Sequence, residues 1–273
     1  MDGKYYSIPR EELGKDAKIP LQILADKEAL FRVMADGMTD EIIRNNNAGK
    51  RTVMILPVGP IGQYPLFVKT VNEKRISLKD VWFINMDEYL NDDGTYIAID
   101  NKLSFRGFMD RTVYTKIDPE LVMPEAQRVF PDPEDPGRIL RLIEELGGVD
   151  VCFGGIGING HVAFNEADPD MSAGEYAKTV TRVLPVSRET RTVNAIGDLG
   201  GAVDMMPNLC ITVGMREILS AKKIRLGVFR DWHRAVVRRA AYGEMTGAFP
   251  VSLLQQHEDV CIFMTQSVAE PAL

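Results

Sequence analysis

A glycine-rich segment at residues 154–169, GGIGINGHVAFNEADP, carries the side chains best suited to proton transfer. Asn159, His161 and Glu166 lie within eight residues of one another. Histidine titrates near neutral pH, so His161 can accept and deliver a proton, and a nearby carboxylate can orient its ring. An isolated loop histidine is often only solvated, so the acid–base interpretation depends on further support.

The glycines of this segment are a second chemical feature. Gly155, Gly157 and Gly160 would let backbone N–H groups approach an anion or a sugar closely. The same three residues satisfy G-x-G-x-x-G, which makes a dinucleotide-dependent oxidoreductase a competing hypothesis. Against that hypothesis, the string lies in the middle of the chain, and the residues that follow it are typical of a loop. We therefore expect no nicotinamide cofactor.

An acidic segment, NMDEYLNDDG at residues 85–94, follows an apolar run and places a carboxylate at its start. Shielding by the predicted sheet would raise the pKa of Asp87, which suits a base that removes a proton from carbon. The alternative is an Asp that caps a turn or a helix. We expect residues 85–94 to form a loop.

A third segment, LPVGPIGQ at residues 56–63, also follows an apolar run. In α/β proteins this position often cradles phosphate, so Gly59 and Pro60 are candidate substrate contacts. A tight turn into a helix that begins near Pro65 explains the same residues.

The elements that must position these segments alternate along the chain. Short apolar or β-branched runs predict buried strands at Thr52–Leu56, Val81–Met86, Val149–Phe153, Leu209–Val213, Ile224–Phe229 and Val260–Thr265. Helical spacing predicts helices at Lys27–Asn45, Gly137–Leu146 and His233–Tyr242. This alternation predicts a three-layer α/β fold, Rossmann-like, with a mostly parallel central sheet and helices on both faces. In such sheets ligands bind at the carboxyl ends of the strands, where the three segments lie.

Composition excludes several classes of function. The 273 residues are 45% apolar, without repeat or long linker, which predicts a single domain over residues 1–273. A net charge of −7 is the wrong sign for a nucleic-acid partner. No run reaches the ~18 apolar residues of a membrane helix, no signal peptide is evident, and the three cysteines lie in strand-like runs as buried thiols. We expect a cytoplasmic protein without a membrane partner.

Taken together, the motifs resemble the glucosamine-6-phosphate deaminase family, a branch of a superfamily that includes galactosamine-6-phosphate isomerases and 6-phosphogluconolactonases. The matching segments span nearly the whole chain: FINMDEYL (83–90), GGIGINGHVAFNE (154–166), TRTVN (190–194), ITVGMREILSAKKI (211–224) and GEMTGAFPVSLLQQHEDVCIF (243–263). The lactonase branch lacks the Phe-Asn-Glu continuation, so the deaminase branch fits better.

The resemblance implies a role for each acid–base residue. Asp87 would move a proton between C2 and C1 of the open-chain amino sugar. His161 would protonate the ring oxygen, and Glu166 and Asn159 would hold its imidazole. The implied reaction is an aldose–ketose isomerisation with loss of ammonia, in amino-sugar catabolism, without cofactor or metal. We place this enzyme among the hydrolases. Members of the family range from monomers to hexamers, which leaves homo-oligomerisation open.

Other positions depart from the family. Its phosphate loop usually reads Thr/Ser-Gly-x-Thr-Pro, whereas Val58-Gly59-Pro60-Ile61-Gly62 lacks both hydroxyls. Ile196 stands where the family has a phosphate-binding Arg. The family's later Lys is replaced within RDWHRA (230–235), with Arg234 as the closest match. We hypothesise that anion recognition is rebuilt around Arg230, His233 and Arg234, and that the sugar substrate differs.

Two alternatives remain from this resemblance. One is a non-catalytic sugar-phosphate sensor, which the lack of an evident helix-turn-helix module and the retained acid–base set make less attractive. The other is a hydrolase of the 6-phosphogluconolactonase type.

Overall fold

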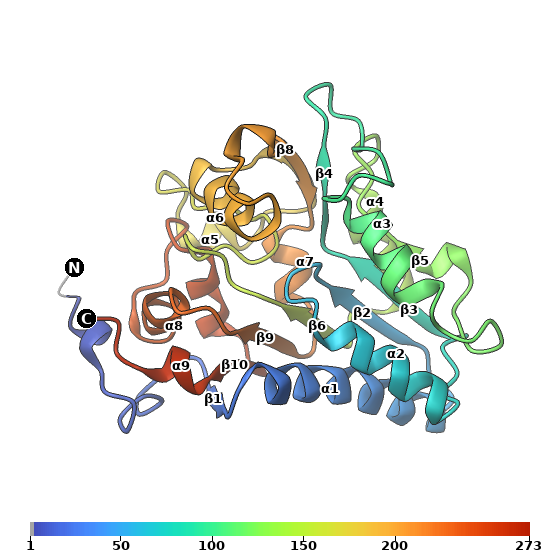
Figure 1. The fold of residues 1–273 in the computed structure, drawn as a ribbon, viewed down its shortest axis with the longest axis horizontal. Coiled ribbons are helices and arrows are strands. Elements are labelled where there is room, and N and C mark those ends of the chain that lie inside the picture. The colour runs from blue at the N-terminus through green and yellow to red at the C-terminus, as the bar shows by residue number, and fades with distance from the viewer. Residues whose placement is uncertain (1–2) are drawn as a thin grey trace.

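The computed structural model describes residues 3–273. The strands are β1 (Leu21–Leu24), β2 (Thr52–Leu56), β3 (Val81–Asn85), β4 (Asp87–Leu90), β5 (Arg128–Val129), β6 (Val151–Gly154), β7 (Arg182–Pro185), β8 (Leu209–Thr212), β9 (Ile224–Val228) and β10 (Val260–Thr265). The helices are α1 (Lys27–Asn47), α2 (Gln63–Glu73), α3 (Phe105–Met109), α4 (Arg138–Leu146), α5 (Ala173–Tyr176), α6 (Arg188–Asp198), α7 (Met215–Leu219), α8 (His233–Tyr242) and α9 (Gln266–Ala269). Figure 1 shows their arrangement.

The expected parallel sheet is present. Seven strands lie in the order β1-β10-β9-β6-β2-β3-β5, and every neighbouring pair is parallel. All five residues of β2 are buried, as a continuous apolar run in the middle of such a sheet requires. The strand order reverses between β2 and β6, because the chain goes from β2 to β3 on one side and from β6 to β9 on the other.

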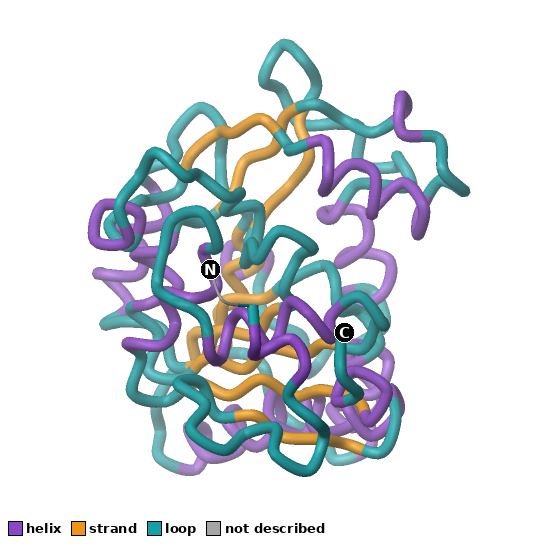
Figure 2. The backbone as a smooth tube through the Cα atoms, turned by 90° about the vertical axis from the view of Figure 1, so that its left-hand side faces the viewer, coloured by secondary structure: helices purple, strands orange, loops and turns teal. Residues whose placement is uncertain are grey.

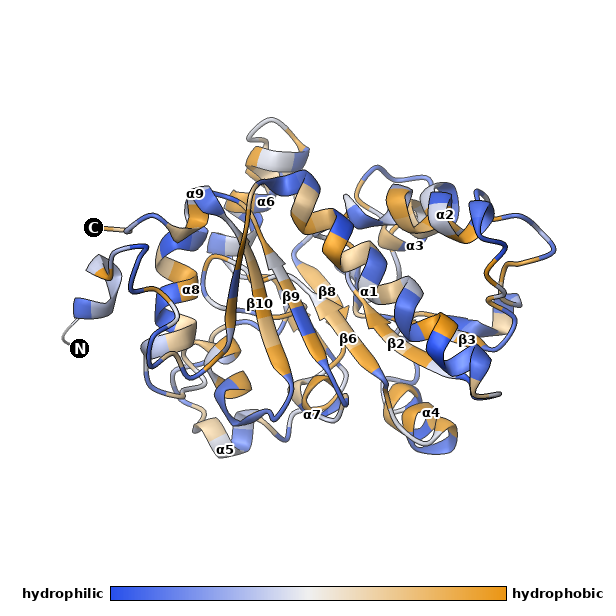
Figure 3. Cartoon of the chain, turned by 90° about the horizontal axis from the view of Figure 1, so that it is seen from below, coloured by the Kyte–Doolittle hydropathy of each residue, from blue (hydrophilic) through white to orange (hydrophobic). Residues whose placement is uncertain are grey.

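Helices cover both faces of this sheet, and each face has its own core. Side chains of α1 and α2, such as Met34 and Phe67, pack against one face together with Phe83 of β3. Side chains of α4, α7 and α8, such as Ile143 and Val237, pack against the other. Figure 3 shows α1 crossing the sheet when the molecule is seen from below. The three-layer α/β architecture predicted from the sequence is therefore confirmed.

A second, smaller sheet corrects two predictions. β4, β8 and β7 form an antiparallel sheet in the order β4-β8-β7, which rises above the main sheet in Figures 1 and 2. The run Leu209–Val213 was expected in the parallel sheet, but β8 lies in the antiparallel one. Residues 85–94 were expected to form a loop, but only Met86 and residues 91–94 lie outside the strands. Asp87 instead pairs with Thr212 across the two strands.

Met86 joins the two sheets. Its N–H donates to the carbonyl of Leu56 at 2.9 Å, and its carbonyl accepts from Val213 N–H at 2.8 Å. The chain thus passes directly from β3 into β4 without a loop, and Asp87 is placed by regular strand pairing. Within residues 3–273, no helix combines the length and the apolar character that crossing a membrane requires.

Candidate active site

A pocket opens at the carboxyl ends of β2 and β6, where the strand order reverses. It has a volume of about 220 Å³. The three segments singled out in the sequence line it, together with α6 and the segment after β9. The loops after β2 and β6 meet closely, because a Cβ at Gly155 would lie 2.8 Å from the carbonyl oxygen of Gly59. Ligand binding at such a reversal is the general behaviour of open α/β sheets.

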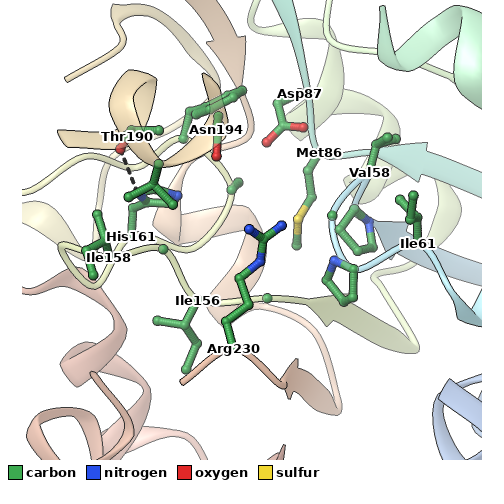
Figure 4. A pocket seen from close by; sticks show the side chains of 18 of the residues that line it. Val58, Ile61, Met86, Asp87, Ile156, Ile158, His161, Thr190, Asn194 and Arg230 are labelled. Atoms are coloured by element: carbon green, nitrogen blue, oxygen red, sulfur yellow. Dashed lines mark hydrogen bonds between the residues drawn. The ribbon is translucent and has the colours of Figure 1, made fainter. Parts of the chain in front are cut away.

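Asp87 points into this pocket from the start of β4 (Figure 4). Its side chain is almost completely buried, with 7% of the residue exposed. Burial, and then the charge of the adjacent Glu88, raises its pKa well above 3.8. A carboxyl in this state gains basicity when ionised, which is what proton removal from carbon requires.

Glu88 points the opposite way and holds β4 in place. Its fully buried carboxylate accepts hydrogen bonds from the backbone N–H groups of Phe105 and Arg106, both at 2.9 Å. It also accepts from Ser104 Oγ at 2.9 Å. These donors form the N-terminal turn of α3, where a carboxylate is favoured. Glu88 therefore fixes the strand that carries Asp87.

His161 faces the pocket on the side opposite the loop after β2, and its ring is held through one nitrogen (Figure 4). Asn159 Nδ2 donates to Glu166 Oε2 at 2.5 Å, which fixes the orientation of the amide. Asn159 Oδ1 then lies 2.8 Å from His161 Nδ1. Because an amide oxygen only accepts, the proton of the neutral ring resides on Nδ1. Nε2 is left facing the pocket, ready to exchange a proton.

Glu166 completes this network as an ionised carboxylate. Burial raises its pKa, but hydrogen bonds and charge from His161, together with hydrogen bonds from Asn159 and Thr190, lower it to about 2. Glu166 Oε2 lies 3.6 Å from His161 Nδ1, close enough to stabilise a positively charged imidazole. The predicted grouping of Asn159, His161 and Glu166 is thus a single hydrogen-bonded unit in the structure.

Thr190 belongs to this unit, although its residue type and position did not predict a role for it. Its hydroxyl lies 3.1 Å from Glu166 Oε2 and 3.3 Å from His161 Nδ1. The residue sits in the first turn of α6, where Ser187 caps the helix by accepting from the Thr190 N–H. Its place in the segment TRTVN was the only signal in the sequence.

The glycines of residues 154–169 serve mainly to admit neighbouring side chains. A Cβ at Gly157 would lie 1.9 Å from Cε1 of His161, so only glycine leaves room for the ring. Gly160 has φ +82° and packs against Phe249, outside the pocket lining. Of the five glycine and proline residues predicted as substrate contacts, Gly59, Pro60, Gly155 and Gly157 line the pocket.

The dinucleotide interpretation of these glycines lacks its structural context. No helix begins after Gly160: residues 161–172 form turns and irregular structure, and the next helix is α5 at Ala173–Tyr176. The fingerprint requires a helix whose N-terminus meets the pyrophosphate.

The three candidate cationic residues, Arg230, His233 and Arg234, differ in how they lie relative to the pocket. Arg234, predicted as a substrate contact, lies outside the pocket lining, and its Nε donates to the carbonyl of Ser267 at 2.9 Å. His233 lines the pocket but is buried; burial lowers its pKa to about 4. Arg230 reaches into the cavity instead (Figure 4). The structure therefore replaces Arg234 with Arg230 as the candidate substrate contact. The reason is that α8 begins at His233 and carries Arg234 away from the pocket.

Known proteins resemble this chain in sequence and in fold. A comparison with protein-family models found no match. A glucosamine-6-phosphate deaminase of Bacillus pumilus is 30% identical over 211 residues, which cover 75% of this chain and 80% of that protein. The chain belongs to the glucosamine-6-phosphate deaminase family. Another member, from Mycoplasma mycoides subsp. mycoides, is 29% identical over 91% of this chain and 96% of that protein.

Solved structures place the fold in the same superfamily. A monomeric glucosamine-6-phosphate deaminase, described as a missing link of the NagB superfamily, has a TM-score of 0.78 at 26% identity, covering 91% of this chain and 98% of that one. A 6-phosphogluconolactonase from Shewanella baltica has a TM-score of 0.62 at 17% identity, covering 90% and 97%, a likeness of fold alone. The names of the glucosamine-6-phosphate deaminase relatives support a deaminase and do not bear out a place among the hydrolases.

Proposed function

We propose that this member of the glucosamine-6-phosphate deaminase family converts an amino-sugar 6-phosphate to the ketose phosphate with release of ammonia. The observation that carries the proposal is the pairing of Asp87 and His161 in one pocket, with His161 held by Asn159, Glu166 and Thr190. A buried carboxyl base and an oriented imidazole acid are the groups that an enolamine reaction requires.

The reaction begins with ring opening. His161 in its protonated form gives the Nε2 proton to the ring oxygen of the bound sugar, and the C1–O bond to that oxygen breaks. The anomeric hydroxyl gives its proton to water, which leaves the open-chain aldehyde. Glu166, ionised at a pKa of about 2, stabilises the imidazolium before the transfer. Because Nδ1 is held by Asn159 Oδ1, only Nε2 exchanges its proton with the substrate.

Isomerisation then depends on Asp87. Its carboxylate removes the C2 proton while the aldehyde oxygen takes up a proton from water, which gives an enolamine. Asp87 then returns a proton to C1 while the amine gives one proton to water, which leaves a ketimine at C2. Water adds to this C=N bond, and ammonia leaves as the ketose forms. The amino sugar and one water molecule thus become the ketose phosphate and ammonia.

Two measurements test the proposal: ammonia release from glucosamine 6-phosphate, and exchange of the C2 proton of the sugar with deuterium in deuterated water. Asp87→Asn abolishes both, while Asp92→Asn, an exposed position beyond β4, leaves both unchanged. Tight binding of the sugar phosphate without exchange would support a sensor instead. Hydrolysis of 6-phosphogluconolactone without ammonia release from any amino sugar would support a lactonase.

We also propose that the protein works in the cytoplasm. The three cysteines, Cys152, Cys210 and Cys261, are free thiols in the structure, as a reducing compartment favours. Equal recovery of the tagged protein in cytosolic and membrane fractions would contradict this location.

A further inference from the structure

A single guanidinium reaches the pocket. Among the lining residues within 3–273, Arg230 is the only Arg or Lys. Its backbone N–H donates to Nδ1 of His233 at 2.9 Å, which fixes the turn after β9. Its side chain makes no hydrogen bond and no ion pair within 4 Å in the described part of the chain. The five N–H donors of this guanidinium are therefore available to a ligand.

The other cationic candidates near the pocket are engaged or neutral. His233 Nε2 lies 2.9 Å from the carbonyl of Ile156 and its Nδ1 accepts from Arg230, so both ring nitrogens have partners in the neutral state. Its lowered pKa, about 4, results first from burial. Arg234 bonds to Ser267 outside the pocket. Neither residue offers a positive charge to a bound anion at neutral pH.

The loop after β2 has no side chain among the pocket-lining residues that could donate a hydrogen bond to a bound anion. Val58, Pro60 and Ile61 line the pocket with apolar side chains, and Ile61 is 44% exposed. Ile196, on the exposed face of α6, is 66% exposed and likewise has no donor. Among the described lining residues, Arg230 is therefore the permanently cationic side chain that can meet an anionic group of the substrate.

The end of α6 brings a negative charge to the same place. Asp198 lines the pocket at the last residue of the helix, and a Cβ at its neighbour Gly197 would lie 3.4 Å from Nη1 of Arg230. Burial raises the pKa of Asp198, while the charges of Arg230 and Lys102 lower it. The helix C-terminus adds partial negative charge. Asp198 therefore acts on the Arg230 guanidinium through its charge, beyond ion-pair distance.

We propose that Arg230 binds the anionic group at C6 of the amino sugar and that Asp198 competes with this group for the guanidinium. The proposal rests on the proposed deaminase function and names the residues that set its specificity. Phosphate and carboxylate both match the guanidinium fork, so the shared chemistry is an anion at C6.

The experiment compares three sugars: glucosamine 6-phosphate, 2-amino-2-deoxyglucuronate and uncharged glucosamine. Arg230→Gln lowers kcat/KM for the anionic substrate by roughly 10–100-fold and leaves that for glucosamine unchanged. Arg230→Lys restores part of the loss. Asp198→Asn raises kcat/KM for the anionic substrate by about 2–5-fold. Arg234→Gln, the matched control four residues further along the chain and outside the pocket lining, changes neither value. The sugar that responds more strongly to Arg230→Gln identifies which anion is the natural one.

Two results would overturn the proposal: no effect of Arg230→Gln on the anionic sugars, or an equal loss with glucosamine, which indicates a structural role. Calorimetric binding of the anionic sugars to Asp87→Asn, with and without Arg230→Gln, separates this inference from the proposed function. If the wild-type protein releases no ammonia, the proposed function fails, while a tenfold loss of binding on Arg230→Gln still supports the anion contact. Unchanged binding in the double variant contradicts it.

Discussion

Thr190 Oγ1 lies 3.1 Å from Glu166 Oε2 and joins the start of α6 to the carboxylate beside His161. The same oxygen lies 3.3 Å from His161 Nδ1 and 3.0 Å from Ser187 Oγ. One buried hydroxyl thus connects the helix cap, the carboxylate and the imidazole. The position of α6 and the orientation of the His161 ring are therefore coupled.

Thr190→Val keeps the shape of the side chain and removes this hydroxyl. We expect kcat to fall about 5–10-fold with little change in KM, since a lost hydrogen bond costs about 1 kcal/mol and Thr190 acts through His161. Thr192→Val removes a hydroxyl that donates to the carbonyl of Arg188 within the same helix, so it is the control and keeps wild-type kcat. Equal kcat values for both variants would remove Thr190 from the network.

Gly157→Ala tests the space that His161 occupies. The added methyl group would overlap the ring, 1.9 Å from Cε1, so the imidazole must move. A displacement of about 1 Å in a catalytic group costs on the order of 100-fold in kcat. Gly174→Ala, whose Cβ meets nothing within 4 Å, is the control. The prediction is wrong if Gly157→Ala retains wild-type activity.

The raised pKa of Asp87 predicts opposite effects of pH on activity and on stability. As a base, Asp87 must be ionised, so kcat falls when the pH drops through its raised pKa. The unfolded chain loses this proton near pH 3.8, while the folded chain retains it to higher pH. The free energy of unfolding therefore decreases as pH rises between these two values.

Asp87→Asn removes the loss of stability that comes from ionising a buried carboxyl. We expect its Tm to exceed that of the wild type at neutral pH, and the difference to vanish below about pH 3.8, where the carboxyl is protonated in both states. Thermal unfolding of both proteins from pH 3 to pH 8 measures the difference. Asp92→Asn, at an exposed position, shows no such pH-dependent gain. A constant difference at all pH values would contradict the assignment to Asp87.

Arg238 bonds both ends of the described chain to α8, so replacing it should lower the stability of the fold. It is completely buried, and its Nη2 donates to the carbonyls of Ile8 and Ala269, each at 2.8 Å. Arg238→Leu leaves these carbonyls without donors, so we expect the free energy of unfolding to fall by about 2–4 kcal/mol. Urea denaturation measures it, with Arg216→Leu, at an exposed position, as the control. Unchanged stability would show that water replaces the guanidinium.

The sequence by itself determined the elements with strong local patterns. The bounds predicted for the strand Thr52–Leu56 and the helix His233–Tyr242 coincide with β2 and α8. Both follow from hydrophobic spacing within one segment, which needs no distant partner. Asn159, His161 and Glu166 were found for the same reason, because they are close in the chain as well as in space.

The features that depend on contacts between residues far apart in the chain were decided only by the tertiary structure. Residues 85–94 carry no strong strand signal, yet Asp87 lies on a strand because Thr212, far away in the chain, pairs with it. Thr190 joins His161 only once α6 is docked. The choice between Arg230 and Arg234 also follows from packing: two arginines four residues apart look alike in sequence, and the start of α8 turns one towards the pocket and the other towards Ser267.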